Sequence, residues 1–166
     1  LRDLQWCVYP KKDELEKLGV FSVTLGSYVP WDVKKNFEII NNEIGWEGDQ
    51  VEGVPPQYPY EKGEYQLQGP RDYLKFIKRG YARTTHLTSL DIRNGRMERD
   101  EAKDLIEKYE GKRPASLDYI LKIIDITEAE WREMAIKNAV SPYKHDFSKE
   151  QSDEPLWDME KWDWNP

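Results

Sequence analysis

Residues 78–102 read KRGYARTTHLTSLDIRNGRMERDEA, a dense group of basic and hydroxyl side chains. Arginine binds carboxylates and phosphates through paired hydrogen bonds, and neighbouring hydroxyl groups can bond to the same oxygens. The stretch therefore predicts a local site for an anion such as a phosphate, a nucleotide or a sugar acid. The alternative left open is a helix face whose arginines are solvated or paired with carboxylates. The side chains concerned are Lys78, Arg79, Arg83, Thr84, Thr85, Ser89, Arg93 and Arg96.

Two residues of this stretch are candidate catalytic groups, His86 and Asp91. Imidazole changes its charge near neutral pH, so His86 can transfer a proton. A single histidine is nevertheless more often structural than catalytic. In the structural alternative, Asp91 and Arg93 only bridge a turn, and Thr84 and Thr85 only cap one.

The charge of the chain is unevenly distributed. The 166 residues carry 25 basic and 32 acidic side chains, which gives a net charge of −7. Residues 71–99 hold eight basic and three acidic residues, so this part carries +5 and the remainder −12. An acidic chain argues against general nucleic-acid binding, which needs a basic surface. A basic stretch inside an acidic chain favours a small anionic partner.

Cysteine and histidine are scarce. Cys7 is the only cysteine, which excludes an internal disulfide bond and a thiolate zinc site. The two histidines are far apart, so we expect no metal site. No apolar run is long enough to span a bilayer and no signal-peptide pattern opens the chain, so we expect no membrane contact. Leu1 is not a start methionine, and we expect a processed chain or a piece of a longer one.

Hydrophobic periodicity predicts a mostly helical chain, with the apolar stripes of the helices forming the core. Gly19 closes the first helix, and Asp32 is the expected N-cap of the second. Thr127 and Glu130 have capping-box spacing and open the last helix. The predicted helical ranges are 11–18, 32–44, 71–93, 99–110, 116–125 and 127–135.

Two segments depart from the helical pattern. Residues 20–30 alternate apolar and polar side chains and predict one strand. Because a lone strand cannot form a stable sheet, we expect its partner strands outside this sequence. Residues 46–70 contain four prolines and four glycines and predict a long ordered loop, suited to a lid or a pocket wall.

The C-terminal tail has a composition of its own. Residues 146–166 hold seven acidic residues against two lysines, with Trp157, Trp162 and Trp164 among them. One interpretation is a partly disordered tail. The other is an aromatic and acidic strap that docks on the basic stretch or on a partner chain.

No self-contained catalytic motif is present in the sequence. The phosphate-binding patterns G-x-x-x-x-G-K-[ST], G-x-G-x-x-G and S-G-G-x-D-S are absent, as is the nucleophile pattern G-x-S-x-G.

Several segments resemble the C-terminal region of N-acetyl sugar amidotransferases. These are relatives of the bacterial enzymes that build acetamidino groups on surface sugars in the lipopolysaccharide, pseudaminic acid and legionaminic acid pathways. The resemblance covers roughly residues 6–143 and is most specific over 78–97. The matching segments are YVPWD at 28–32, GW at 45–46, VEG at 51–53, RDYLKFIKRGYARTTHLTSLDIRNGRM at 71–97, EA at 101–102 and KRPASLD at 112–118.

The resemblance implies an ATP-dependent reaction in the full family chain, with ATP and Mg as cofactors. ATP would adenylate the N-acetyl carbonyl oxygen, and ammonia from a separate glutaminase with a cyclase-like partner would displace AMP to leave an acetamidine. The PP-loop domain that binds ATP is not in this sequence. Residues 1–30 would be the end of that α/β domain, 31–143 a helical C-terminal domain and 144–166 the tail. The implied location is cytoplasmic, and a homo-oligomer is possible.

The resemblance also marks individual positions. His86 stands where many members have aspartate, which puts proton transfer at that position in doubt, and Glu98 stands where a serine or threonine cap is common. Glu52 matches the acidic residue of the VEG segment. The implied substrate- or nucleotide-binding residues are Glu52, Lys78, Arg79, Arg83, Thr84, Thr85, Arg93 and Arg96.

Two other functions stay open. The chain could be a non-catalytic module that binds an anionic sugar or docks an amidotransferase subunit. It could also be an interaction protein whose acidic, tryptophan-rich tail is the working part.

Overall fold

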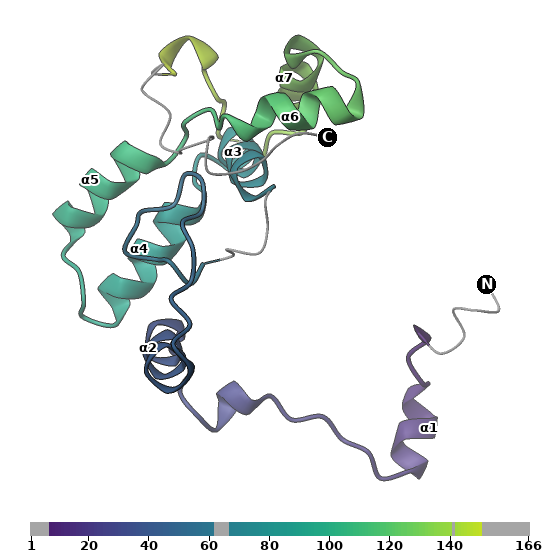
Figure 1. The fold of residues 1–166 in the computed structure, drawn as a ribbon. Helices are drawn as coiled ribbons and strands as arrows, with labels where there is room; N and C mark the ends of the chain where they lie inside the picture. The colour runs from purple at the N-terminus through teal and green to yellow at the C-terminus, as the bar shows by residue number, and fades with distance from the viewer. Residues whose placement is uncertain (1–6, 62–66, 141, 151–166) are drawn as a thin grey trace. The chain divides into compact units, whose positions relative to one another are not determined.

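The computed structural model describes residues 7–61, 67–140 and 142–150, and within these ranges the regular secondary structure is entirely helical (Figure 1). The predicted mostly helical fold is confirmed. The α-helices are α1 (Lys12–Lys17), α2 (Val33–Ile44), α3 (Gln68–Arg79), α4 (Arg83–Arg93), α5 (Arg99–Tyr109), α6 (Ser116–Ile124) and α7 (Glu128–Lys137).

The helix ends follow local chemistry. Asp32 caps α2 by accepting a hydrogen bond from the Lys34 amide at 3.1 Å. Thr127 and Glu130 form the predicted capping box at the start of α7. The predicted continuous helix over 71–93 is wrong, because Gly80 adopts a left-handed conformation with φ of 79° and ends α3.

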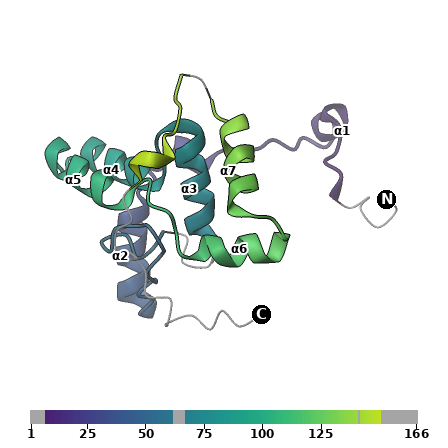
Figure 2. The ribbon, with the colours of Figure 1, turned by 90° about the horizontal axis from the view of Figure 1, so that it is seen from above.

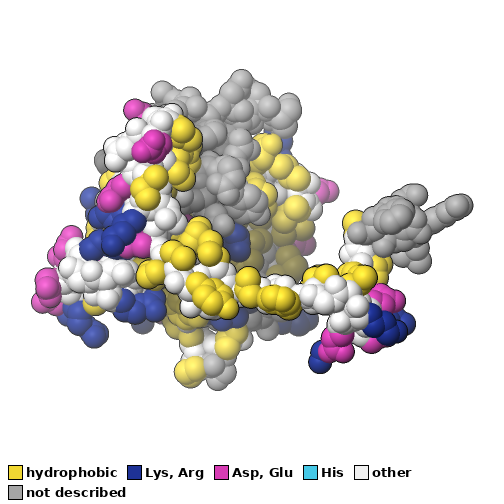
Figure 3. Space-filling model, turned by 90° about the horizontal axis from the view of Figure 1, so that it is seen from below, with side chains coloured by type: hydrophobic (Ala, Val, Ile, Leu, Met, Phe, Trp, Pro, Cys, Tyr) yellow, Lys and Arg dark blue, Asp and Glu magenta, His cyan; other side chains and the backbone are white. Residues whose placement is uncertain are grey.

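The chain divides into two compact units, residues 1–43 and 44–166. The first has no buried side chain among its described residues. The apolar stripe of α2, predicted to be core, is largely exposed, with Ile40 at 40%. Figure 3 shows apolar side chains along the part of this unit that leads to α1. Residues 7–43, the described part of the first unit, therefore form no hydrophobic core of their own.

The strand predicted over residues 20–30 is not formed. Residues 20–24 have no regular structure, and the 3₁₀ turn Leu25–Ser27 follows them. Thr24 has an extended backbone, with φ of −88° and ψ of 116°. A strand is defined by hydrogen bonds to a neighbour, and the described residues supply no neighbouring strand.

The second unit has its main core where α3 packs against α6 and α7 (Figure 2). Ile77 and Leu117 are completely buried at its centre. Tyr73 stacks on Trp131 with ring centroids 5.5 Å apart and planes inclined by 10°. Most residues of the predicted apolar stripes of these three helices thus lie in the core. Ile124 and Met134 are exceptions, since both are about half exposed.

A smaller core joins the loop before α3 to α4, which pairs with α5 as a helical hairpin (Figure 1). Val51, Val54 and Tyr58 of the loop pack with Leu87 of α4. The described part of the predicted long loop is thus ordered and packed against α4. It ends before Gln68, because α3 begins there and takes Pro70 into its first turn, where a missing amide costs little.

No helix in the described ranges is long and apolar enough to cross a membrane.

Candidate functional site

Arg83, at the first position of α4, is held by two carboxylates. Its Nη1 donates to Oε1 of Glu61 at 2.7 Å, and its Nε donates to Oδ2 of Asp72 at 3.2 Å. Asp72 also accepts a hydrogen bond from the side-chain Nε2 of Gln68 at 2.5 Å. The side chains of this ion cluster are 12–16% exposed. The cluster joins α4 to α3 and to the loop, and it leaves Arg83 little capacity for a further anion.

Arg96, beyond the other end of α4, forms a second cluster with Asp91. The Nε of Arg96 donates to Oδ1 of Asp91 at 2.7 Å, and the hydroxyl of Tyr58 donates to Oδ2 at 2.9 Å. Burial, reinforced by the bond to Asp91, raises the pKa of Tyr58 well above its usual range. Asp91, a candidate catalytic residue, is 4% exposed and has a carboxylate bonded to both neighbours. Its observed contacts join α4 to Arg96 and to Tyr58 of the loop, which is a structural role.

A third carboxylate lies at the N-terminus of α4. Glu110, just beyond the end of α5, accepts a hydrogen bond from the Thr85 amide at 2.9 Å and another from the Thr85 hydroxyl at 2.5 Å. The first amides of a helix lack intrahelical partners and carry a partial positive charge, which a carboxylate offsets. Thr85 thus helps to close the α4–α5 hairpin.

Glu52 binds the N-terminus of α6 in the way that Glu110 binds the N-terminus of α4. Its carboxylate accepts a hydrogen bond from the Ser116 amide at 3.2 Å and another from the Ser116 hydroxyl. A side-chain carbon at Gly69 would lie 2.1 Å from Oε2 of Glu52, so a larger residue there would displace the Glu52 carboxylate. Burial raises the pKa of Glu52 above its ordinary value of 4.5, against the opposing effect of the Ser116 hydrogen bonds. Glu52 therefore links the loop to α6.

The remaining predicted site residues lie apart from one another. His86, Arg79 and Arg93 are exposed, and Arg93 donates from Nε to the Ser89 carbonyl oxygen at 3.1 Å. Lys78 is partly exposed near the end of α3. Thr84 is 1% exposed, so a ligand can reach its hydroxyl only if neighbouring residues move.

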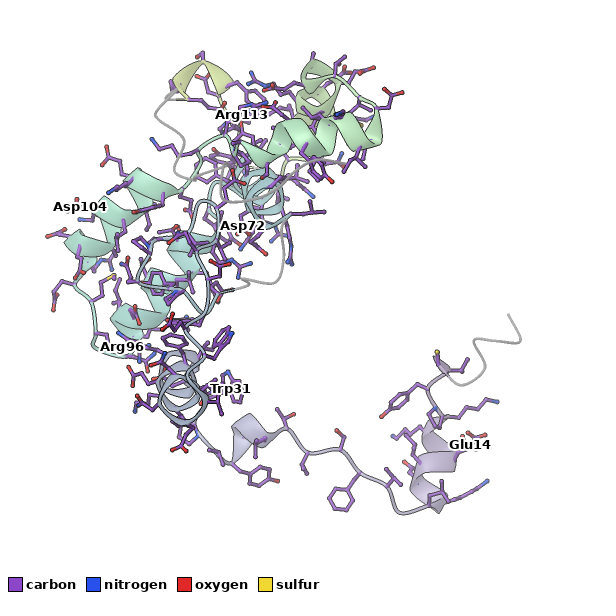
Figure 4. The ribbon with its side chains drawn as sticks, viewed as in Figure 1. Glu14, Trp31, Asp72, Arg96, Asp104 and Arg113 are labelled. Atoms are coloured by element: carbon purple, nitrogen blue, oxygen red, sulfur yellow. The ribbon has the colours of Figure 1, made fainter. Side chains whose placement is uncertain are left out.

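The predicted anion site is thus not brought together as one cluster. Arg83 and Arg96 lie at opposite ends of α4, roughly 15 Å apart along the helix. Figure 4 likewise shows Asp72 and Arg96 in different parts of the structure. Arg83 and Arg96 therefore follow the alternative interpretation of the basic stretch, in which arginines pair with carboxylates of the chain itself.

The described residues do not form a site that fits ATP and Mg. Arg83 and Arg96 already have carboxylate partners, and the sequence has no glycine-rich phosphate loop. No group of three or more histidine, cysteine, aspartate or glutamate side chains in these ranges is arranged to hold a metal ion.

Sequence reasoning missed a cavity of about 410 Å³. Its walls are formed by α3, by the end of α5 with the turn that follows it, and by residues 143–150. His145 is nearly buried there. The sequence signal was the aromatic and histidine cluster Tyr143-x-His145-x-Phe147, which lies at the boundary between the predicted helical domain and tail. The three tail tryptophans lie outside the described residues.

The Arg83 cluster makes a first prediction. Arg83→Gln should lower the free energy of unfolding by about 3 kcal/mol, because it leaves the carboxylates of Glu61 and Asp72 largely buried without a counter-charge. Arg93→Gln, at an exposed position of the same helix, should change stability by no more than about 0.5 kcal/mol. Urea unfolding measures both variants. Equal losses in the two would contradict a structural role for Arg83.

Glu52 makes a second prediction, about pH. Because its folded-state pKa is raised, the folded chain binds this proton more tightly than the unfolded chain does. The resulting stability is fully present below the ordinary value of 4.5 and is lost as the pH rises through the folded pKa. Wild-type stability minus that of Glu52→Gln should therefore fall as the pH is raised. The exposed variant Glu133→Gln corrects for general charge effects, and a difference that rose with pH would contradict the prediction.

Comparison with known proteins gives one match. A family described as "LPS biosynthesis protein WbpG-like, C-terminal domain" matches residues 52–162. This range begins later and ends later than the resemblance seen in the sequence, and it takes in most of the tail. Searches of curated proteins and of solved structures find no match. The family match spans about two thirds of the chain. The chain therefore belongs to the LPS biosynthesis family whose members carry a WbpG-like C-terminal domain.

Proposed function

We propose that the chain is part of an ATP-dependent N-acetyl sugar amidotransferase that acts in lipopolysaccharide biosynthesis. The observation that carries the proposal is the family match over residues 52–162. That range contains the 78–97 run and the KRPASLD segment, the parts of the sequence most similar to such enzymes.

The proposed reaction converts an acetamido group into an acetamidino group. The nitrogen of ammonia becomes bonded to the carbonyl carbon, and the carbonyl oxygen leaves as part of AMP after the activation step has released pyrophosphate. ATP supplies the activation that makes this oxygen a leaving group. Because this sequence has no phosphate-binding loop, we assign ATP binding to a part of the protein outside this chain. Ammonia comes from a glutaminase partner with a cyclase-like subunit, and the reaction is cytoplasmic.

The geometry supports a positioning role for the second unit. Carboxylates of Glu52, Asp72, Asp91 and Glu110 tie the loop and four helices to one another. Such a framework holds walls and loops in fixed positions, which is what binding a substrate beside a reacting centre requires. The exposed apolar side chains of the first unit suit packing against the ATP-binding domain, to which residues 1–30 would belong.

A second candidate function is a non-catalytic module that binds a sugar or a partner subunit. The observation that favours it is the absence of any phosphate-binding loop from this sequence. The two candidates differ in whether the product sugar depends on this chain.

The test is the chemistry of the surface polysaccharide. In cells that make the intact protein, we delete residues 44–150 and analyse the polysaccharide sugars by mass spectrometry. The amidotransferase proposal predicts that acetamidino sugars disappear and acetamido sugars take their place. Expression of the intact gene should restore them.

A polysaccharide that keeps its acetamidino groups after the deletion would overturn the amidotransferase proposal and favour the binding module. A polysaccharide without acetamidino groups in the parent cells would also overturn it. The point variant Arg93→Gln, which leaves the charge clusters intact, then shows whether this exposed arginine contributes to turnover.

A further inference from the structure

The cavity of about 410 Å³ in the second unit has the size of a small-molecule site. Phe76 of α3 and Tyr143 form aromatic walls with ring centroids 6.1 Å apart. Glu107 and Gly111 line it from the end of α5 and the turn beyond. Lys144 and the other residues of 143–150 close the remaining side. The site is distinct from the 78–96 basic stretch, none of whose side chains lines it.

Two glycines allow the aromatic walls to lie where they do. A side-chain carbon at Gly80 would lie 2.6 Å from the ring of Tyr143, and one at Gly111 would lie 2.5 Å from the ring of Phe76. Both glycines also have positive φ angles, 79° and 75°. The backbone therefore approaches both rings more closely than any other residue would permit.

The 143–150 wall is fixed by a hydrogen-bonded chain. The Nε2 of His145 lies 2.6 Å from Oε1 of Glu150, and its Nδ1 lies 3.0 Å from the hydroxyl of Tyr143. In the neutral ring, the bond to an ionised Glu150 places the proton on Nε2, so Nδ1 accepts from Tyr143. The hydroxyl of Tyr73, on α3, also donates to Glu150. Phe147 meets the His145 ring edge to face at 4.7 Å.

The polar lining points to an uncharged ligand. The four carboxylates among the lining residues are nearly balanced by three lysines, so the cavity does not concentrate charge of one sign. A phosphate or a nucleotide is favoured by a surplus of positive charge, which is missing here. A sugar ring presents alternate donors and acceptors around its edge and apolar C–H groups on its faces. The C–H faces of a sugar can pack against the two aromatic walls, and its donors and acceptors can bond to the charged side chains around them.

Two lining residues are available for such a ligand. Glu107 and Lys144 are exposed, and neither side chain has a hydrogen bond or ion pair in the described part of the chain. Glu110 and Glu150, by contrast, are already bonded to Thr85 and to His145. A carboxylate accepts from sugar hydroxyls, and an ammonium group donates to their oxygens.

We propose that this cavity binds the acetamido sugar, with the ring against Phe76 and Tyr143 and the hydroxyl groups bonded to Glu107 and Lys144. The proposal rests on the proposed function, because that function makes an acetamido sugar the ligand. It moves sugar recognition from the arginine-rich stretch to a site that the 143–150 segment completes.

The experiment is ligand-observed NMR with the 166-residue chain. The probes are N-acetylglucosamine, N-acetylgalactosamine and N-acetylmannosamine, and inorganic phosphate is tested separately. Glu107→Gln and Lys144→Ala each remove one ligand contact without breaking an observed interaction. Each should weaken binding of the preferred sugar about tenfold. Glu133→Gln and Lys137→Ala, which make the same exchanges on the exposed face of α7, should bind as wild type does.

Equal binding by the cavity variants and the wild type would overturn the cavity assignment. Absence of sugar binding, or binding of phosphate alone, would overturn it as well. Circular dichroism of each variant checks that the fold is kept. None of these outcomes decides the proposed function, which is judged separately by the acetamidino content of the polysaccharide.

Discussion

The ion cluster of Arg83 with Asp72 and Glu61 is the contact on which the second unit depends most. Arg83 opens α4, Asp72 belongs to α3 and Glu61 belongs to the loop. Three parts of the chain are therefore joined through one guanidinium group. A charge removed from water must be paired, and this requirement fixes how the three elements meet. The same requirement places Asp91 against Arg96 and Tyr58.

Carboxylates at helix N-termini extend this pattern. Glu110 caps α4 and Glu52 caps α6, each from a distant part of the sequence. The described residues of the unit form two small cores rather than one large core, which suits a chain that is 34% charged. Hydrogen bonds and ion pairs therefore help to fix the relative positions of the helices, a role that apolar packing fills in other domains. The residues that make the stretch at 78–102 distinctive are, in large part, the residues that hold the fold.

Much of the helical structure was predictable, because its signals are local. The capping box at Thr127 and the apolar stripe of α3 depend on residues within one or two turns. The strand over 20–30 could not be judged in this way, since a strand exists only beside a neighbour. The charge pattern showed that Arg83 needed an anionic partner but not which one. Its partners Asp72 and Glu61 are 11 and 22 residues away and meet it only through tertiary folding. The cavity was unpredictable for the same reason, since its walls come from three separate segments.

The central claim is that Arg83 and Arg96 serve the fold, whereas exposed basic residues are left for ligands. NMR of the arginine side-chain N–H groups tests it directly, with hydrogen exchange measured first and inorganic phosphate added afterwards. The account predicts that the Nε–H groups of Arg83 and Arg96 exchange slowly and do not respond to phosphate, while that of Arg79 exchanges quickly. Rapid exchange at Arg83 and Arg96, with signals that shift on adding phosphate, would contradict the account and restore them to the anion site.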